Sequence, residues 1–315
     1  MEHSIALISG TTSGVGYATA CALAAEGWQE IIVTERSLEH AQQTAAQLAA
    51  ETRIKVFTPL ELDLDKPVSV QSTLDELIKR GRSIDFLMLN ADMVPDKRVM
   101  AAGVEAAQAP LLGYHQLIAG LLRANLLDPN ARIVIAGSEA TRAHVPTFSF
   151  VDVADLVTEH FRNDRSAAVE ALLRSTPSVK DEASRAYIES KLIITWWAAA
   201  LARRLPSGMA VFAAGTATDT KVVRNASPAL KYLFIPIVSP IPSMNQTPET
   251  APLWYVQGAE FGTEDSAQFF ASAQGTFTGP IEAMRHLQFH DPANQEGAWQ
   301  AVVNVSGVDL FTEHP

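Results

Sequence analysis

Hydrophobic and polar positions follow two patterns that alternate along the chain. Short apolar runs rich in β-branched and aromatic residues are separated by longer segments with the spacing of amphipathic helices. This alternation predicts an α/β fold with a doubly wound, mainly parallel sheet covered by helices on both faces. Strands are predicted at 4–10, 30–35, 55–62, 84–90, 131–138 and 209–215, with a weaker seventh candidate at 275–279. Helices are predicted at 14–26, 38–50, 67–81, 100–126 and 184–204.

Two segments interrupt the alternation. Residues 139–183 include the amphipathic stretch FVDVADLVTEHF at 150–161, and residues 225–250 are rich in proline and large apolar side chains. We expect both inserts to cover the carboxyl ends of the strands, where open α/β sheets bind ligands. The alternative is that they elaborate the exterior without touching a ligand. No linker is evident, so residues 1–315 are expected to form a single domain with these inserts.

Composition excludes several classes of function. The chain has 315 residues and a net charge of −11 without a dense basic run, which argues against a nucleic-acid partner. Cys21 is the single cysteine, so neither an intrachain disulfide nor a cysteine-rich zinc site is expected, and no metal site is predicted. The start of the chain lacks the pattern of a signal peptide, and no stretch has the length of a membrane span. A cytoplasmic protein is therefore expected.

A glycine-rich turn, SGTTSGVG, follows the first predicted strand and opens a helix. Gly10, Gly14 and Gly16 would permit a tight turn, close approach of the backbone to a pyrophosphate, and close packing of the helix on the sheet. The spacing G-x-x-x-G-x-G is a variant of the dinucleotide-binding fingerprint. A plain turn is the alternative, but the position between strand and helix favours a Rossmann-type dinucleotide site.

With these motifs the chain resembles the short-chain dehydrogenase/reductase family from the first strand to about residue 221. Further motifs come in the family's order: Asp63-Leu64, Asn90-Ala91, Ser138, and the Y-x-x-x-K pair Tyr187 and Lys191. Asp92 stands where the family has a glycine. The resemblance implies a catalytic set of Ser138, Tyr187 and Lys191. It implies cofactor contacts from Gly10, Thr12, Ser13, Gly14, Val15, Gly16, Glu35, Arg36, Asp63, Leu64, Asn90, Ala91, Tyr187, Lys191, Gly215, Thr216, Thr218 and Thr220.

Tyr187 and Lys191 are four residues apart, so they share one face of a helix. A free tyrosine has a pKa near 10, and a neighbouring ammonium lowers that pKa towards the operating pH. The family resemblance implies that Lys191 also holds the nicotinamide ribose and that Ser138 orients the substrate oxygen. Tyr187 would then exchange a proton with that oxygen as hydride is transferred. Taken alone, the pair could simply lie on an exposed helix face.

One family residue is missing. The relay asparagine, three residues before a glycine on the fourth long helix, is replaced by Pro110, which precedes Gly113. Proline offers no side-chain amide and is expected to perturb the helix. The relay could use another group, be slow, or be absent. His115 follows one turn later, and we expect it to be a packed or surface residue without a catalytic role.

The choice of cofactor depends on Glu35 and Arg36 after the second strand. A carboxylate there would bind the 2′-hydroxyl of NAD, whereas an arginine would pair with the 2′-phosphate of NADP. Arg36 stands where phosphate-preferring relatives have arginine, so NADP is preferred over NAD. Glu35 could instead be a solvated charge turned away from the pocket.

The first reading is an NAD(P)-dependent oxidoreductase acting on a carbonyl or alcohol of an apolar small molecule. The alternative from another class is a dinucleotide-binding sensor or scaffold with little turnover, which Pro110 would favour. The segments ERSLEHAQQ and AYIESKL resemble retinol dehydrogenases and light-dependent protochlorophyllide oxidoreductase, and GTATDTKVVR resembles the latter. A protochlorophyllide-type double-bond reductase is a third reading, against which stand Thr216 in place of a cysteine and Ala214-Gly215 in place of Pro-Gly.

Two expectations concern packing and assembly. Trp196 and Trp197, on the predicted active-site helix, are expected to pack in the core rather than stack on substrate. The resemblance also implies a possible homo-oligomer, because many relatives assemble through their fourth and fifth long helices. The insert before Tyr187 could block that contact.

Overall fold

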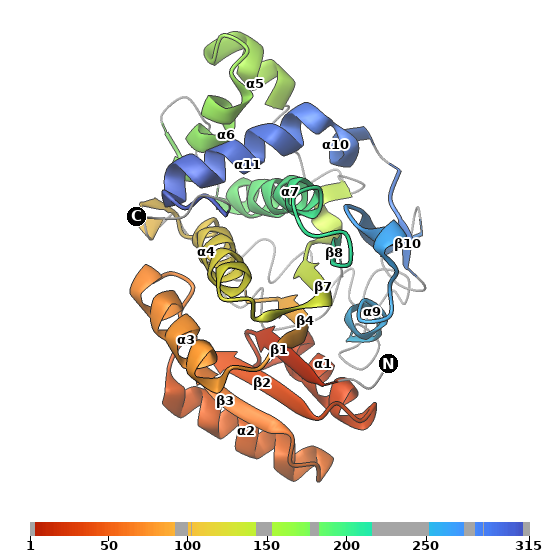
Figure 1. Cartoon of the computed structure of the whole chain (residues 1–315). Helices are drawn as coiled ribbons and strands as arrows, with labels where there is room; N and C mark the ends of the chain where they lie inside the picture. Colours follow the sequence, from red (N-terminus) through yellow and green to blue (C-terminus); the bar gives the residue numbers. More distant parts are fainter. Residues whose placement is uncertain are drawn as a thin grey trace, which may run out of the picture.

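One eight-stranded sheet forms the centre of the molecule in the computed structural model (Figure 1), which describes residues 4–91, 100–101, 103–142, 153–176, 183–215, 252–273, 281–285 and 287–310. Its strands are β1 Ile5–Ser9, β2 Glu30–Glu35, β3 Phe57–Glu61, β4 Ile84–Leu89, β7 Leu127–Ala136, β8 Ala210–Ala214, β9 Phe269–Ser272 and β10 Ile281–Ala283. Their order is β10-β9-β8-β7-β4-β1-β2-β3, and β10 runs antiparallel to β9 while the other neighbours are parallel. The predicted doubly wound, mainly parallel sheet is confirmed.

Helices cover both faces of this sheet. The helices are α1 Gly14–Ala25, α2 Leu38–Thr52, α3 Pro67–Arg80, α4 Ala109–Arg123, α5 Val153–His160, α6 Arg165–Arg174, α7 Ala183–Ala202, α9 Pro252–Gln257, α10 Leu287–His290 and α11 Pro292–Ser306, with 3₁₀ turns η1 Glu139–Arg142 and η4 Thr263–Asp265. Helix α1 packs against α2 and α9 on one face, whereas α3, α4 and α7 cover the other, where α11 lies across α4 and α7.

Alternating side chains divide the core into two layers. Along β1, Ile5 and Leu7 join the apolar cluster under α3, α4 and α7, whereas Ala6 and Ile8 join the cluster under α1, α2 and α9. Successive side chains of a strand point to opposite faces, so a strand covered on both faces must be apolar throughout. The continuous apolar runs that predicted the strands have this origin.

Two elements differ from the sequence-based prediction. The helix predicted at 100–126 spans Ala109–Arg123, and it is preceded by a short hairpin of β5, Met100–Ala101, and β6, Val104–Glu105. The strand β9, Phe269–Ser272, which runs parallel to β8, was not predicted. The segment 275–279, predicted as the seventh strand, lies outside the described residues.

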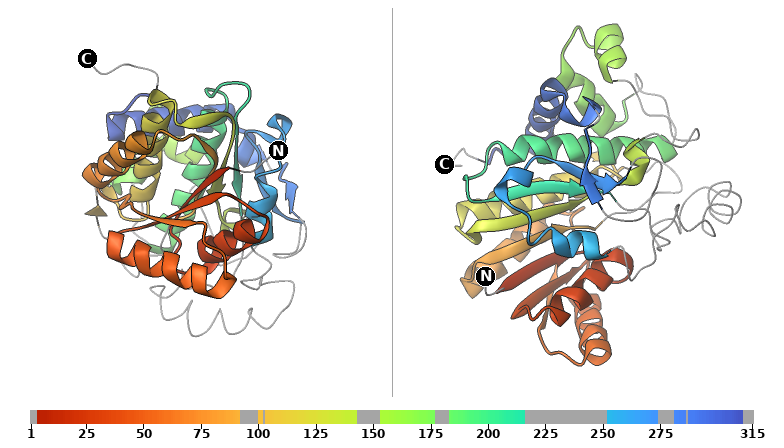
Figure 2. Two further views of the ribbon diagram at one scale, coloured as in Figure 1. Left: turned by 60° about the horizontal axis from the view of Figure 1, so that its bottom comes forward. Right: turned by 90° about the vertical axis from the view of Figure 1, so that its right-hand side faces the viewer.

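The described part of the first insert includes the 3₁₀ turn η1 and the helices α5 and α6. Helix α6 packs mainly against α11, and it also contacts α5, α7 and β6 (Figures 1 and 2). Val153, Leu156 and Val157 of α5 are buried in the apolar cluster that includes α11. The apolar face of α5 is therefore used for packing within the chain. The second insert, 225–250, lies outside the described residues.

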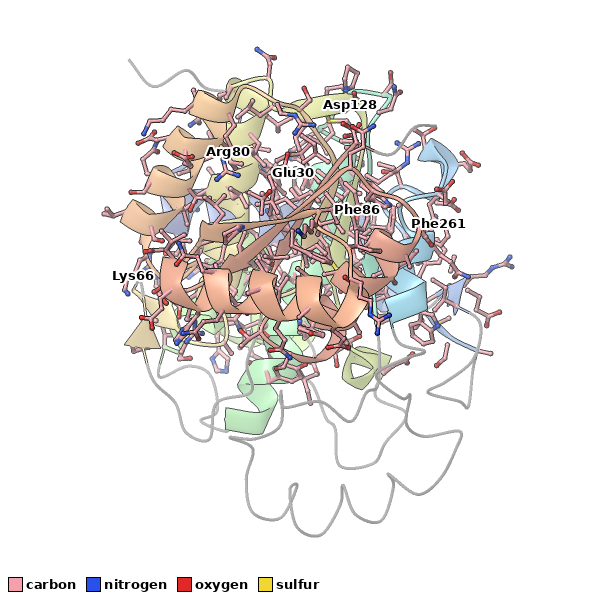
Figure 3. All side chains as sticks on the ribbon, turned by 90° about the horizontal axis from the view of Figure 1, so that it is seen from below. Glu30, Lys66, Arg80, Phe86, Asp128 and Phe261 are labelled. Carbon is pink, nitrogen blue, oxygen red and sulfur yellow. The ribbon has the colours of Figure 1, made fainter. Side chains whose placement is uncertain are left out.

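One group of ion pairs lies at the amino ends of the strands. Glu30, the first residue of β2, pairs with Arg80 at 3.9 Å and also with Arg82. Figure 3 shows Glu30 and Arg80 at this end, away from the carboxyl ends of the strands. The chemistry-bearing motifs follow the carboxyl ends, so these pairs are remote from the candidate site.

Candidate active site

The glycine turn and the end of β4 meet at the point where the strand order reverses. The side-chain amide of Asn90 donates to the carbonyls of Ser9, at 3.3 Å, and Gly10, at 3.0 Å. The hydroxyl of Ser9 accepts from the backbone N–H groups of Asn90, at 2.8 Å, and Ala91, at 3.1 Å. Because β1 pairs with both β2 and β4, this is the switch point at which doubly wound sheets bind ligands.

Two positions of the turn must be glycine, because neighbouring backbone atoms leave no room for a Cβ atom there. Gly10 has a φ of +72°, and a Cβ atom there would lie 2.7 Å from the Cα atom of Ala91. A Cβ atom at Gly16 would lie 2.3 Å from the carbonyl oxygen of Gly10. Ser13 precedes α1 with extended backbone, and its side chain makes no capping hydrogen bond. The turn thus has the shape that a pyrophosphate-binding turn needs, with the first N–H groups of α1 behind it.

Glu35, at the end of β2, is bound to the glycine turn. Its Oε1 accepts from the hydroxyl of Thr11 at 3.0 Å, and its Oε2 accepts from the hydroxyl of Thr12. Glu35 is 8% exposed and Thr11 is fully buried. The alternative that Glu35 is a solvated charge is therefore wrong, because two threonine hydroxyls hold its carboxylate inside the protein.

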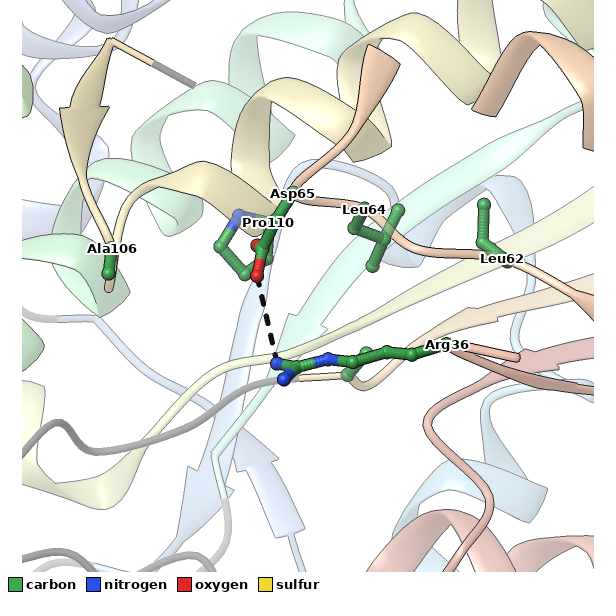
Figure 4. Close-up of a pocket in the computed structure, with 7 residues that line it drawn as sticks. Arg36, Leu62, Leu64, Asp65, Ala106 and Pro110 are labelled. Carbon is green, nitrogen blue, oxygen red and sulfur yellow. Dashed lines mark ion pairs between the residues drawn. The ribbon is translucent and has the colours of Figure 1, made fainter. Parts of the chain in front are cut away.

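Arg36 projects into a pocket beside the glycine turn (Figure 4). Its guanidinium lies 3.8 Å from the carboxylate of Asp65, and its side chain is 62% exposed. The pocket is otherwise lined by Leu62, Leu64, Asp65, Ala91, Ala106 and Pro110. Apolar side chains, one guanidinium and the switch point thus come together, an arrangement that suits the adenosine end of a dinucleotide.

Of the predicted pair Asp63-Leu64, one residue lines this pocket. Leu64 lines it, whereas the carboxylate of Asp63 is buried and lies 2.8 Å from the ammonium of Lys66. This hydrogen bond raises the pKa of Lys66. Gly113 of α4 packs on the same segment, since a Cβ atom there would lie 2.6 Å from the carbonyl oxygen of Leu64.

At the other end of the site, α7 brings its lysine to the end of β7. Lys191 is 3% exposed, and its Nζ donates to the carbonyl oxygen of Ala136 at 2.6 Å. The same Nζ lies 5.9 Å from the centroid of the Tyr187 ring. Ser138, which is buried, lies two residues beyond Ala136. The three residues of the predicted catalytic set therefore come from two elements that meet at the carboxyl end of β7.

Sequence reasoning missed a buried carboxylate beside Ser138. Glu139 is 2% exposed, and its Oε1 accepts from the backbone N–H of Ser272 at 2.9 Å and from the Ser272 hydroxyl at 2.8 Å. Gly215 packs on the same turn, because a Cβ atom there would lie 3.2 Å from the backbone nitrogen of Glu139. The GSEAT segment shows an acidic residue after Ser138, but nothing local indicates its burial.

Pro110 does not perturb the helix, which corrects the sequence-based expectation. It lies in the first turn of α4, where a backbone N–H has no partner within the helix and none is lost. The ring of Pro110 instead lines the pocket of Arg36. The residue following Gly113, Tyr114, donates its hydroxyl to the carbonyl oxygen of Ala91 at 2.5 Å and so ties α4 to the switch point.

His115 is a packed residue, as expected. Its Nδ1 accepts from the indole N–H of Trp197 at 3.1 Å, which places the ring proton on Nε2, 2.8 Å from the carbonyl oxygen of Val308. Burial lowers the pKa of His115 to about 4. Trp196 and Trp197 are also buried, which confirms that they belong to the core.

Several predicted features are not covered by the structure. Thr216, Thr218 and Thr220 lie outside the described residues, as does Asp92. Within the described ranges, no cluster of His, Cys, Asp and Glu side chains could hold a metal ion. No helix among those ranges has the length and apolar character needed to cross a bilayer.

Comparison with known proteins matches the chain to the family that its motifs resemble. Residues 4–150 match the family described as short chain dehydrogenase. The WW domain-containing oxidoreductase of Drosophila melanogaster is 30% identical over 66% of this chain and 47% of its own length. The chloroplastic protochlorophyllide reductase of Cucumis sativus is 32% identical over 42% of this chain and 34% of its own length. The matches cover about a third to a half of these relatives' lengths.

Solved structures share the fold. A crystal structure of an uncharacterised protein from Mycobacterium paratuberculosis matches 99% of this chain and 96% of its own, with a TM-score of 0.69 and 18% identity. L-Sorbose reductase from Gluconobacter frateurii, complexed with NADPH and L-sorbose, matches 89% of this chain and 98% of its own, with a TM-score of 0.60 and 15% identity. At 18% and 15% sequence identity, these similarities show a shared fold alone.

Proposed function

The chain belongs to the short-chain dehydrogenase/reductase family, and from this premise we propose that it is an NAD(P)-dependent oxidoreductase. The reaction is hydride transfer between a nicotinamide cofactor and a carbonyl or alcohol of an apolar small molecule. One observation carries the proposal. The turn shaped for a pyrophosphate and the buried Lys191 with its Tyr187 neighbour both lie at the carboxyl edge of the same sheet.

The glycine turn and the Arg36 pocket fit the cofactor. Gly10 and Gly16 let the turn pack closely against Ala91 and on itself, and the pocket offers apolar walls beside the guanidinium of Arg36 and the carboxylate of Asp65. The pyrophosphate would lie at the first turn of α1 and the adenosine in the pocket. Lys191, whose ammonium has three N–H donors, would bind the nicotinamide ribose in addition to Ala136.

Tyr187 is the proposed proton donor. The ammonium of Lys191 lies 5.9 Å from the centroid of the Tyr187 ring, so a positive charge stands beside the proposed proton donor. Ser138 would hold the substrate oxygen by its hydroxyl. In the reductive direction the cofactor, when bound, would supply hydride to the carbonyl carbon, and Tyr187 would give its proton to the oxygen, so that the product would be an alcohol.

NADP is the proposed preferred cofactor. A carboxylate at the end of β2 would select NAD by binding the ribose 2′-hydroxyl, but both oxygens of Glu35 accept bonds from Thr11 and Thr12. Arg36 faces the pocket and would pair with a 2′-phosphate. The support for an apolar substrate is the composition of residues 225–250, because the apolar residues of α5 pack in the core.

The test is Tyr187→Phe, assayed by cofactor absorbance against a panel of ketones and aldehydes. Turnover should fall at least ~100-fold, the usual scale of general acid catalysis, while the Kd for NADPH stays nearly constant. Tyr17→Phe is the matched control, because the hydroxyl of Tyr17 binds Glu51 on α2, and it should leave turnover unchanged. Normal turnover in Tyr187→Phe would refute the role of Tyr187. Tight NADPH binding without turnover of any substrate by the wild type would favour the sensor reading.

A further inference from the structure

The carboxylate of Glu139 is buried at the carboxyl end of the sheet, immediately after Ser138. Burying a carboxylate is costly unless hydrogen-bond donors compensate for lost water. Here two donors of a single residue do so: the backbone N–H and the hydroxyl of Ser272 both point to Oε1. Ser272 is fully buried and lies 133 positions further along the chain. The interaction thus joins two segments that are distant in sequence.

The pair forms where three strand ends meet. Gly137, after β7, donates its N–H to the carbonyl oxygen of Ala214 at 2.8 Å, and Gly215, after β8, donates to Phe270 of β9 at 2.7 Å. In a parallel ladder, alternate N–H groups of a strand need an acceptor from the neighbouring strand. At Ser272, the last residue of β9, that acceptor is the side chain of Glu139.

The turn that carries Ser138 is confined by this contact. The carbonyl oxygen of Ser138 accepts from the N–H and the hydroxyl of Thr141, and both of these bonds lie within the turn itself. A Cβ atom on Gly215 would lie 3.2 Å from the carbonyl carbon of Ser138, so the end of β8 closes one side. The Glu139–Ser272 bonds tie the same turn to β9.

We propose that Glu139 is a positioning residue for the hydride-transfer reaction, acting by clamping the Ser138 turn to the end of β9. The inference rests on the proposed function, since it assigns Glu139 an effect through Ser138. A displacement of about 1 Å in a group that orients a substrate can lower turnover ~100-fold. The clamp requires an acceptor at the position of Oε1 rather than a negative charge, which makes the amide variant informative.

Four variants test the clamp: Glu139→Ala, Glu139→Gln, Ser272→Ala and the control Glu282→Ala. Glu139→Ala should lower kcat ~10-fold or more, and Glu139→Gln should recover most of the loss because its amide oxygen accepts the same bonds. Ser272→Ala keeps the backbone donor and should be intermediate. Glu282 is exposed on β10, opposite Ala271 of β9, so its removal should leave kcat unchanged. The Kd for NADPH should stay within about threefold, because the glycine turn and Arg36 follow other strands.

A second readout separates positioning from general damage. Amide hydrogen exchange of residues 137–142 should be faster in Glu139→Ala than in the wild type and in Glu139→Gln, with the exchange of β1 and β4 unchanged. Wild-type kcat in Glu139→Ala would overturn the clamp and leave the proposed function intact. The clamp would also be overturned if Glu139→Ala and Glu139→Gln lost equal amounts of kcat. It would likewise be overturned if slower turnover came with weaker NADPH binding and faster amide exchange throughout the protein. A wild type that turns over no carbonyl or alcohol would instead refute the proposed function and, with it, the catalytic consequence of the clamp.

Discussion

At the scale of single residues, Glu35 and Arg36 show how two neighbours at a strand end take different environments. Their side chains diverge, so that the carboxylate binds the threonines of the glycine turn and the guanidinium enters the pocket (Figure 4). The sequence identified both as candidates and favoured NADP through the position of Arg36, but it could not show where the carboxylate of Glu35 lies. Because the hydroxyls of Thr11 and Thr12 already bind the carboxylate of Glu35, the preference for NADP can be tested at Arg36.

Arg36→Ala should weaken NADPH binding roughly 10- to 100-fold and leave NADH binding nearly unchanged, because a charge-assisted pair with the 2′-phosphate is lost. Isothermal titration calorimetry with both cofactors measures the difference. Arg82→Ala is the control, since it removes the same charge at the amino end of the sheet, where Arg82 pairs with Glu30. An equal loss for both cofactors would mean that Arg36 contacts the adenine alone.

At the scale of elements, His115 joins three helices on one face of the sheet. It lies on α4, accepts a hydrogen bond from Trp197 of α7, and stands edge-on to Trp299 of α11 with ring centroids 5.3 Å apart. Burial holds the pKa of His115 at about 4, below the value near 6.5 in an unfolded chain. The folded protein therefore keeps this histidine neutral over a pH range in which the unfolded chain protonates it.

The free energy of unfolding should consequently fall as the pH drops from about 6.5 to about 4, by about 3 kcal/mol in total from this group. His115→Asn supplies a donor and an acceptor without titrating, so it should be less stable at neutral pH but have a flatter pH dependence in this window. Urea unfolding at a series of pH values measures both. His40→Asn, an exposed site on α2, is the control. Parallel pH profiles for wild type and His115→Asn would contradict the prediction.

Helix α11 is an element that the sequence pattern did not predict. Its ends carry recognisable caps: the carboxylate of Asp291 accepts from the N–H groups of Ala293 and Asn294, and Gly307 ends the helix with a φ of +67°. Its buried face, however, includes Asn294, Gln295 and Gly297, so the usual apolar spacing is weak. No helix was predicted here from the sequence, although the Asp-Pro and Ser-Gly pairs mark its two ends.

At the scale of the whole molecule, α11 covers the surface formed by α4 and α7 (Figure 1). It packs on both helices, and α6 packs on α11 in turn. Arg204 contributes by pairing with Glu296 at 2.7 Å and lying 4.4 Å from the centre of the Trp299 ring. The fourth and fifth long helices, where the family resemblance implied an oligomer contact, are therefore engaged within the chain.

We expect this chain to be a monomer in solution, because the face that would form the family's helix-mediated interface is already buried by α11. Size-exclusion chromatography with light scattering should give a mass near 34.0 kDa that does not change with protein concentration. A stable dimer would contradict the prediction unless cross-linking placed the contact on another face. Binding of NADPH should leave the mass unaltered, since the cofactor site lies at the carboxyl edge of the sheet.

The sequence by itself determined the fold class, the position of the glycine turn and the order of the motifs, because each depends on local periodicity or on residues close together in the chain. Continuous apolar runs require strands covered on both faces, and the close approach at Gly10 and Gly16 requires glycine. Tertiary structure alone decided the partners of Glu35 and Glu139 and the covering of α4 and α7 by α11. These contacts join side chains far apart in sequence, and a hydrogen bond between distant residues leaves no periodic trace in the chain.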